Sequence, residues 1–325
     1  YNMKIIHFIF SNGISGHEKG LIEYVINNNN KEIENIIYFF TDNIYLVDEF
    51  KKKQYPIEKK FVKIIKIKSF KFLSCLFISK KIIDKESFNI IHSHLTICDL
   101  VISLCKLIFH KSFFHISTRP FDYSYSKYTI IKYKILYSYI CNKSINHQIF
   151  ISDHVKKITN KYESFINKNF STIYYGLKNK IIAKPKKRNK IILGMVGRLV
   201  NWKGHLIGIK IINDFYKKNY FKKDFELRLY GRGIEETKIK NFININSIKY
   251  IKLIDDIKNT DIIFDEIDIL IHPSLNEGLG LVILEALQNG KPCVVSNRGA
   301  MKEIINHKHN GYIFTFDQEE TLVKG

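Results

Sequence analysis

Short apolar runs recur along the chain, and most are followed by a polar or glycine-bearing turn and then by a helical pattern. The runs alternate little between polar and apolar residues, as expected of strands buried on both faces of a parallel sheet. In the first half of the chain they lie at residues 4–10, 36–40, 61–67, 89–92, 113–118, 147–152 and 171–177. Strands and helices that alternate in this way predict an α/β fold.

The same pattern restarts after a segment of different composition. Residues 178–190 hold Pro185, a basic run and few apolar residues, which is typical of a linker. Beyond it, strands are predicted at 191–196, 225–230, 247–257, 267–271 and 309–314, and another near 291. We therefore predict a Rossmann-like domain at 1–180, a linker at 181–190 and a second Rossmann-like domain at 191–325. The two doubly wound domains are expected to face each other across a cleft.

The composition indicates a folded protein of a reducing compartment. A chain of 325 residues can form two domains, and 45% hydrophobic with 14% aromatic residues excludes a disordered protein. The five cysteines show no C-x-x-C spacing and are expected to be buried thiols. The N-terminus lacks a signal-peptide pattern, and no apolar run is long enough for a membrane span. We therefore expect a cytoplasmic location.

The net charge of +21 is concentrated in one half of the chain. Residues 1–190 hold 33 Lys and Arg against 14 Asp and Glu, whereas residues 191–325 hold 19 against 17. A basic half predicts an anionic partner, such as an inner-membrane surface, a phosphorylated acceptor or nucleic acid. A solvated lysine surface is the alternative interpretation.

The segment 271–290 carries the most specific chemistry. A strand ends at His272-Pro273-Ser274, a loop with glycines follows, and a helix then begins. Backbone amides at a helix start bind anions, while the carboxylates of Glu277 and Glu285 could bind hydroxyl groups on either side. This combination suits a nucleotide sugar, although a strand–turn–helix with a capping carboxylate fits the spacing equally well.

Basic residues follow another predicted strand in the second domain. Arg198 comes directly after Gly197, and Lys203 stands five residues further on, before a helix. Arg binds phosphate with two parallel hydrogen bonds and Lys acts as a point charge, so both could converge on a diphosphate. An exposed basic loop is the alternative. The Gly231-x-Gly233 turn is a weaker signal of the same kind.

The first domain offers candidate ligand groups where its predicted strands end. His92 and His94 close one strand, and Thr118-Arg119 closes the next. Ligands bind at the carboxyl ends of parallel strands, so two histidines there point to a site, although a lone histidine at such a position is usually structural. The aromatic and basic segment 121–140 suits a bilayer interface or sugar stacking, and equally a helix packed on the sheet.

Three motifs together resemble a known family. Glu277 and Glu285 form an E-x7-E pattern preceded by Pro273-Ser274, Arg198 and Lys203 form G-R-x4-K-G, and His92 with His94 forms I-H-x-H. This set resembles the retaining GT-B glycosyltransferases of family 4 over nearly the whole chain. The resemblance implies a GT-B fold of two Rossmann-like domains.

The resemblance also implies roles for single residues. Arg198 and Lys203 would bind the donor diphosphate, Glu277 the sugar hydroxyls and Glu285 the ribose. His94, supported by His92, would face the sugar. The remaining expected donor-site residues are Gly197, Gly231, Gly278, Gly280, Leu281 and Val282. On the acceptor side we expect Gly16, which stands where the family has a pair of glycines, and Arg119, which replaces a histidine or asparagine.

We predict a hexosyltransferase that retains the anomeric configuration. No Asp-x-Asp motif is present, so no metal and no cofactor are expected beyond the nucleotide-sugar co-substrate, UDP-linked more than GDP-linked. The expected acceptor is a glycan or lipid-linked intermediate of surface polysaccharides such as lipopolysaccharide, O-antigen or capsule, at the inner membrane face. The chain ends at Gly325, before the closing helices that the family carries, so we expect a truncated second domain. The alternatives are a GT-B nucleotide-sugar epimerase and a non-catalytic basic protein that binds a membrane or nucleic acid, for which no specific nucleic-acid motif is found.

Overall fold

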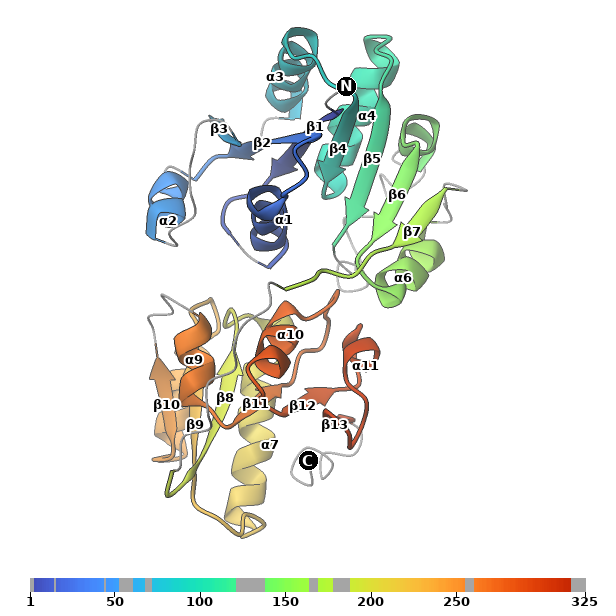
Figure 1. The fold of residues 1–325 in the computed structure, drawn as a ribbon. Coiled ribbons are helices and arrows are strands. Elements are labelled where there is room, and N and C mark those ends of the chain that lie inside the picture. The colour runs from blue at the N-terminus through green and yellow to red at the C-terminus, as the bar shows by residue number, and fades with distance from the viewer. Residues whose placement is uncertain are drawn as a thin grey trace. The chain divides into compact units, whose positions relative to one another are not determined.

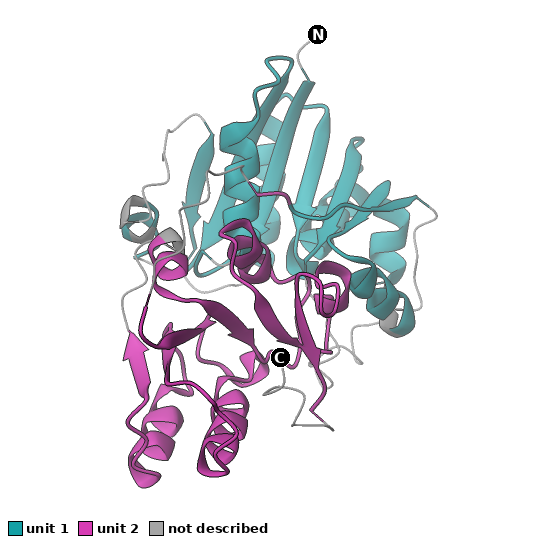
Figure 2. Cartoon of the chain, turned by 60° about the horizontal axis from the view of Figure 1, so that its bottom comes forward, with its two compact units in different colours: residues 1–175 teal, residues 176–325 magenta. Residues whose placement is uncertain are grey.

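The computed structural model describes residues 3–14, 16–43, 45–52, 61–67, 72–120, 138–163, 169–177, 188–254 and 260–316. Backbone contacts divide the chain into two compact units, residues 1–175 and 176–325, which Figure 2 distinguishes by colour. Most of the predicted linker and of the aromatic segment lies outside the described residues. Among the described residues, none of the helices combines the length and the apolar character needed to cross a bilayer.

The first unit is a parallel sheet of seven strands in the order β3-β2-β1-β4-β5-β6-β7 (Figure 1). Its elements are β1 (Met3–Phe10), α1 (Gly16–Asn27), β2 (Ile33–Thr41), α2 (Leu46–Lys52), β3 (Val62–Lys66), α3 (Phe72–Lys85), β4 (Ile90–His94), α4 (Thr96–Ile108), β5 (Phe114–Arg119), β6 (His147–Phe150), α6 (Asp153–Glu163) and β7 (Phe170–Thr172).

Helices cover both faces of this sheet, which explains the unbroken apolar runs. On one face, Ile6 and Phe8 of β1 belong to a core with residues of α3 and α4. On the other face, Ile9 packs in a core with residues of α1 and α2. His7 alternates with Ile6 and Phe8 along β1, so its side chain lies on the α1 face. A polar residue therefore stands in an otherwise apolar core position.

The second unit repeats the architecture with six parallel strands in the order β10-β9-β8-β11-β12-β13. Its elements are β8 (Ile191–Val196), the 3-10 turn η2 (Asn201–Lys203), α7 (His205–Lys217), β9 (Phe225–Tyr230), α8 (Glu236–Ile245), β10 (Ile251–Ile254), α9 (Thr260–Glu266), β11 (Ile269–His272), α10 (Leu281–Gln288), β12 (Cys293–Ser296), α11 (Met301–Ile304) and β13 (Gly311–Phe314). The predicted fold class of two Rossmann-like parallel-sheet domains is confirmed.

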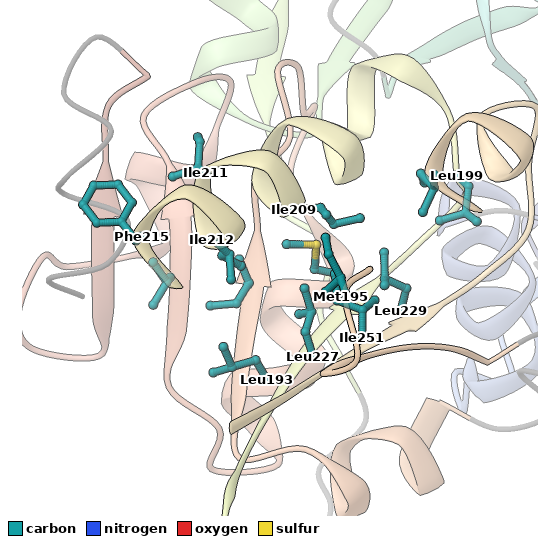
Figure 3. Close-up of a cluster of buried hydrophobic side chains, with 14 of the residues drawn as sticks. Leu193, Met195, Leu199, Ile209, Ile211, Ile212, Phe215, Leu227, Leu229 and Ile251 are labelled. Carbon is teal, nitrogen blue, oxygen red and sulfur yellow. The ribbon is translucent and has the colours of Figure 1, made fainter. Parts of the chain in front are cut away.

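The core of the second unit also has two layers. Figure 3 shows α7 side chains such as Ile209 and Ile212 packed over Leu193 and Leu227 of the sheet. The opposite face of the sheet packs against a cluster that includes Phe264 of α9 and residues of α10 and α11. The loops at the carboxyl edge of this sheet therefore connect strands to helices that are packed against one face of the sheet or the other.

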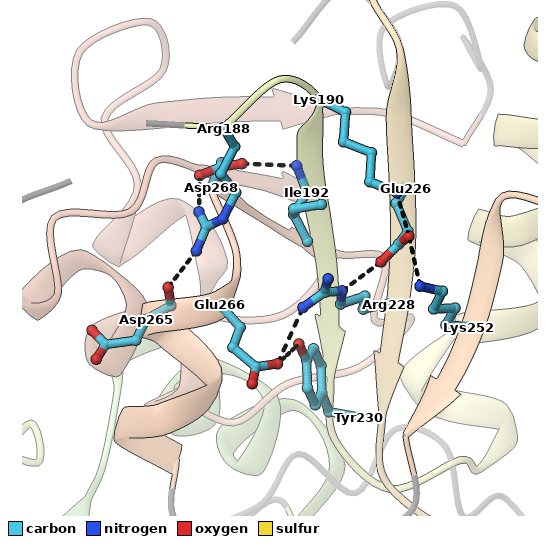
Figure 4. Close-up of polar contacts among 10 residues, drawn as sticks. All are labelled: Arg188, Lys190, Ile192, Glu226, Arg228, Tyr230, Lys252, Asp265, Glu266 and Asp268. Carbon is cyan, nitrogen blue, oxygen red and sulfur yellow. Dashed lines mark hydrogen bonds and ion pairs between the residues drawn. The ribbon is translucent and has the colours of Figure 1, made fainter. Parts of the chain in front are cut away.

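A charged network occupies the opposite, amino-terminal edge of the same sheet (Figure 4). The buried carboxylate of Glu226 in β9 accepts hydrogen bonds from Lys190 at 2.6 Å and Arg228 at 2.7 Å, and Lys252 lies 3.0 Å away. Burial alone would raise the pKa of Glu226, but these cations lower it to about 2. The network thus links β9 to β10 and to the segment that precedes β8.

Two predicted strands are much shorter in the structure than their apolar runs. The described part of the run 247–257, which ends at residue 254, holds β10 alone, because Ser247 adopts a φ of +50° and closes α8 through a hydrogen bond to the Asn244 carbonyl. Residues 171–177 yield only the end of β7. Neither change moves a predicted site residue.

The strand order reverses between β1 and β4 in the first unit, and between β8 and β11 in the second. At such a point the connecting loops leave in opposite directions, and ligands of open α/β sheets bind beside the carboxyl ends of these strands. The strands end at Phe10 and His94 in one unit, and at Val196 and His272 in the other. The predicted site residues cluster at these ends.

Candidate functional site

The loop after β8 lies directly against the loop after β11. Gly204 has a φ of +69°, and a Cβ atom there would come within 2.0 Å of the Pro273 carbonyl oxygen. Only glycine fits both the backbone conformation and this close approach. Leu275 N–H and the Ser274 hydroxyl both donate to the Trp202 carbonyl, at 2.8 and 2.9 Å. The two loops therefore form one rigid platform.

Glu277 is the central side chain of this platform. Its Oε2 atom lies 2.5 Å from Lys203 Nζ and 3.1 Å from His272 Nε2. Burial would raise the pKa of Glu277, but the charge of Lys203 and the hydrogen bond from His272 lower it to about 2. Burial also lowers the pKa of His272, so that residue is neutral and donates its Nε2–H to the carboxylate. Glu277 is thus an oriented anion.

The backbone of Glu277 is fixed as well. Gly299 has a φ of +66°, and a Cβ atom there would come within 2.4 Å of the Glu277 carbonyl oxygen. That oxygen accepts a hydrogen bond from the Ala300 amide at 3.0 Å. The carboxylate is therefore positioned from both its side chain and its main chain, as a preorganised binding group requires.

The start of α10 provides amides for an anion. Gly280 is its N-cap residue, with φ of +93°, and no side chain of the described residues caps the helix. The amides of Ile283 and Leu284 bond to the Gly280 carbonyl, so those of Leu281 and Val282 precede the internal ladder. Glu285 lies one turn further along and is buried. Phosphate oxygens suit such a helix start.

Arg198 adds a cation to the same loop. Its side chain is exposed, with the guanidinium 5.7 Å from the centre of the Trp202 ring. Gly197 and Gly231 both have strongly positive φ, and a Cβ atom at Gly231 would meet the Gly197 carbonyl oxygen at 2.0 Å. The ends of β8 and β9 therefore approach each other closely beside Arg198.

The second unit thus brings its predicted donor-site residues to one edge of one sheet. They are Gly197, Arg198, Lys203, Gly231, Glu277, Gly278, Gly280, Leu281, Val282 and Glu285. The sequence reasoning assigned no role to His272 or to the buried His205. The position of His272 at the end of a predicted strand, five residues before Glu277, could have indicated that it belongs to the site. Together these groups can neutralise phosphate charge and accept hydrogen bonds from hydroxyls.

The first unit holds a cluster of histidines at its own switch point. His7 of β1 is directly opposite His92 of β4, and Ile9 is opposite His94. The rings of His92 and His94 stack at 4.2 Å, and His17 of α1 lies 5.3 Å from His94. Burial lowers the pKa of His7 to about 4 and those of His92 and His94 well below their usual value. All three rings are neutral near pH 7.

This cluster has the geometry of a metal-binding group. His7, His92 and His94 each offer a ring nitrogen within 4.8 Å of the others. Hydrogen bonds already engage several of these nitrogens, since His7 Nδ1 lies 3.1 Å from His94 Nε2 and His92 Nε2 lies 2.7 Å from Thr118 Oγ1. Neutral imidazoles of this kind bind zinc and related ions.

Gly16 begins α1, immediately before the buried His17. The ring of His17 is hydrogen-bonded through Nδ1 to the hydroxyl of Tyr175. Gly16 is exposed at the helix start, so it lies where a loop-borne ligand contact was predicted. Its role in acceptor binding stays a prediction.

Arg119 differs from the expectation of an acceptor contact. Its side chain is fully buried, 3.4 Å from the Asp99 carboxylate and 2.9 Å from the Thr96 hydroxyl, so β5 is tied to α4. Asp99 also accepts a hydrogen bond from Ser93 at 2.5 Å. A guanidinium with a buried carboxylate partner has a structural role, and the partner on α4 could not be identified from the local sequence.

Comparisons with known proteins agree with this geometry. Residues 178–325 match the family model described as Glycosyl transferases group 1. An uncharacterized glycosyltransferase of Methanocaldococcus jannaschii is 27% identical over 322 residues, which cover 96% of this chain and 82% of that protein. An uncharacterized glycosyltransferase of Haemophilus influenzae is 33% identical over 153 residues, covering 46% of this chain and 40% of the relative.

A third relative has a more specific name. It is the UDP-Gal:alpha-D-GlcNAc-diphosphoundecaprenol alpha-1,3-galactosyltransferase of Escherichia coli, 29% identical over 152 residues. The match covers 45% of this chain and 38% of that enzyme. The chain thus spans less than half the length of two of these relatives.

Solved structures share the fold. The lipopolysaccharide outer core galactosyltransferase WaaB has a TM-score of 0.75 at 18% identity, covering 99% of this chain and 88% of that one. Anabaena Alr3699/HepE in complex with UDP and glucose has a TM-score of 0.78 at 16% identity, with the same coverage. These similarities show the GT-B fold.

Proposed function

We propose that this chain moves a sugar from a nucleotide diphosphate donor to a glycan or lipid-linked acceptor, because residues 178–325 match the family model described as Glycosyl transferases group 1. We further propose that the anomeric configuration is retained, as the resemblance to family 4 implies. The observation that carries the proposal is the oriented Glu277 carboxylate, 2.5 Å from Lys203, in the loop that precedes α10.

In this proposal, the second unit stabilises the departing nucleotide diphosphate. Arg198, Lys203 and the amides of Leu281 and Val282 oppose the charge that develops on the phosphate oxygens as the glycosidic bond breaks. These cations would neutralise the phosphate charge that a metal ion neutralises in other enzymes, so we propose a metal-independent reaction. Glu285, buried on α10, would accept hydrogen bonds from the ribose hydroxyls.

Glu277 acts as a hydroxyl acceptor and not as a covalent nucleophile. A carboxylate that Lys203 and His272 both engage is stabilised as an anion and has little freedom to attack a carbon atom. We therefore assign it to the sugar hydroxyls. The acceptor would attack the same face of the sugar that the diphosphate leaves. By the resemblance to family 4, we also propose that the ring of His94 binds a sugar hydroxyl.

The donor and the acceptor are inferred from relatives. Anabaena Alr3699/HepE was solved with UDP and glucose, and the Escherichia coli relative uses a UDP-linked galactose and a diphosphoundecaprenol acceptor, by its name. We propose a UDP-sugar donor and an acceptor in the synthesis of a surface polysaccharide. The excess of positive charge in residues 1–190 supports action at an anionic membrane surface.

The first test measures thermal stabilisation by UDP, GDP, ADP and CMP and by the corresponding nucleotide sugars. A ligand that binds only the folded state raises the melting temperature, and one of these nucleotides should do so in the wild type. Arg198→Ala and Lys203→Ala should each lose most of this shift. Transfer or hydrolysis of the sugar should fall roughly 100-fold or more in either variant, the scale of other charge-stabilising donors.

Lys222→Ala is the matched control, because Lys222 is an exposed lysine that precedes β9. It should behave like the wild type in both measurements. Near-normal rates in both Arg198→Ala and Lys203→Ala would contradict the mechanism. Turnover of the donor to another nucleotide sugar without any acceptor would instead indicate an epimerase.

A further inference from the structure

A chain of hydrogen bonds runs through the histidine cluster of the first unit. His7 Nε2 lies 3.0 Å from Asn35 Oδ1, and His7 Nδ1 lies 3.1 Å from His94 Nε2. All three side chains are buried, with 1% of His7, 3% of Asn35 and 3% of His94 exposed. They come from β1, β2 and β4, neighbouring strands of one sheet, so the sheet fixes their spacing.

The amide oxygen of Asn35 sets the direction of every bond in this chain. An oxygen accepts, so His7 must carry its proton on Nε2. His7 Nδ1 then has only a lone pair, and His94 must donate to it from Nε2–H. Each ring is neutral, because burial depresses its pKa, and a neutral imidazole carries a single ring proton.

The last atom of the chain is His94 Nδ1. It is buried and has no hydrogen-bond partner among the described residues. With the ring proton on Nε2, this nitrogen has a lone pair and can only accept a hydrogen bond. A buried acceptor without a partner is costly to the folded state, which suggests that a ligand completes it.

We propose that Asn35 and His7 are positioning residues that hold His94 in the Nε2–H tautomer, so that Nδ1 accepts a hydrogen bond from a ligand hydroxyl. This inference rests on the proposed function, which gives His94 a sugar as its ligand. It adds that His94 acts as a hydrogen-bond acceptor. It also adds that Asn35, which is linked to the His94 ring through two successive hydrogen bonds, determines the His94 tautomer.

The test is the tautomer of His94 in the ligand-free chain. Two-bond proton–nitrogen NMR correlations on a chain labelled with ¹⁵N-histidine distinguish the two neutral tautomers, and the His94 signals are identified by their loss in His94→Gln. We expect the Nε2–H pattern in the wild type. Asn35→Asp should keep it, because a carboxylate can only accept, whereas Asn35→Leu should lose it, since leucine offers His7 no acceptor.

Transfer rates provide the functional readout. Asn35→Leu should slow sugar transfer by roughly 5- to 10-fold, the effect of one misdirected hydrogen bond, while stabilisation by UDP is unchanged. Asn35→Asp should recover part of the rate, which a merely structural role of Asn35 does not predict.

Two results would overturn the inference. One is a wild-type spectrum in which His94 carries its proton on Nδ1, and the other is an Asn35→Leu spectrum identical to that of the wild type. Because the spectra need neither substrate nor activity, they decide the inference even if no transferase activity is found. If Asn35→Leu folds poorly, the wild-type and Asn35→Asp spectra decide it, since a proton on His94 Nδ1 in either would overturn the inference. A wild type with the Nε2–H tautomer but no turnover of any nucleotide sugar would contradict the proposed function alone.

Discussion

At the scale of single residues, the contacts of the Glu277 carboxylate determine its pKa and thereby its contribution to the stability of the second unit. It contacts one cation, Lys203, and one neutral donor, His272. A carboxylate that is more acidic in the folded than in the unfolded state stabilises the fold above its unfolded pKa. This contribution is lost as the pH falls through its folded pKa.

We therefore expect Glu277→Gln to flatten the acid side of the stability curve. The pKa of Glu277 falls from 4.5 to about 2 on folding, so the wild type should gain roughly 3 kcal/mol from ionised Glu277 above about pH 5 and lose it between pH 4.5 and 2. Urea unfolding of both proteins between pH 6 and 2 measures this difference. Parallel curves would show that the ion pair does not contribute.

A second prediction concerns the close approach at Gly204. Gly204→Ala places a Cβ atom 2.0 Å from the Pro273 carbonyl oxygen at a φ of +69°, so the two loops must separate. We expect a loss of about 2 kcal/mol or more in unfolding free energy, and a larger loss of nucleotide binding. Gly176→Ala is the control, since a Cβ atom at Gly176 meets nothing within 4 Å. Equal melting temperatures of the two variants would contradict this account.

At the scale of elements, the buried pair of Arg119 and Asp99 fastens α4 to the end of β5. Removing one partner leaves a buried charge, so Arg119→Met should cost roughly 3–5 kcal/mol of unfolding free energy. Adding Asp99→Asn should restore part of that loss. Lys240→Ala, which removes an exposed ion pair on α8, should leave the melting temperature nearly unchanged, because solvent screens such pairs. A stable Arg119→Met variant with a specific defect in acceptor binding would instead favour the original expectation of a ligand contact.

The central strands were predictable because they lie in apolar runs buried on both faces of their sheets. Helices α2 and α9 were not predicted, since seven residues span too few turns to show a helical period. The positions of Arg198, Lys203 and Glu277 at strand ends follow from their spacing along the chain. The ion pair between Lys203 and Glu277 does not, because it depends on how one loop packs on another, 74 residues away.

The same limit applies to the first unit. His92 and His94 could be placed at the end of a strand from the sequence alone. Their link to His7 and Asn35 depends on the strand order, which puts β1 between β2 and β4. The local sequence around a strand does not show which other strands become its neighbours in the sheet.

At the scale of the whole molecule, charge is the dominant property. Residues 1–190 carry nearly the whole excess of +21. We expect the chain to sediment with phosphatidylglycerol vesicles at low salt and to be released as salt screens the attraction, with about 1 kcal/mol from each basic residue near the surface. Phosphatidylcholine vesicles are the control. Failure to sediment with the anionic vesicles at low salt would contradict action at a membrane surface.

The contact between Lys203 and Glu277 also bears on which small anions can compete for the site. Because Lys203 already has a counterion 2.5 Å away, a ligand that offers only negative charge must separate the pair or share the cation with Glu277. Inorganic phosphate gains little from that exchange. A ligand with phosphates for the cation and hydroxyls for the carboxylate satisfies both members at once. The platform thereby discriminates against abundant simple anions before any feature of the nucleotide base is recognised.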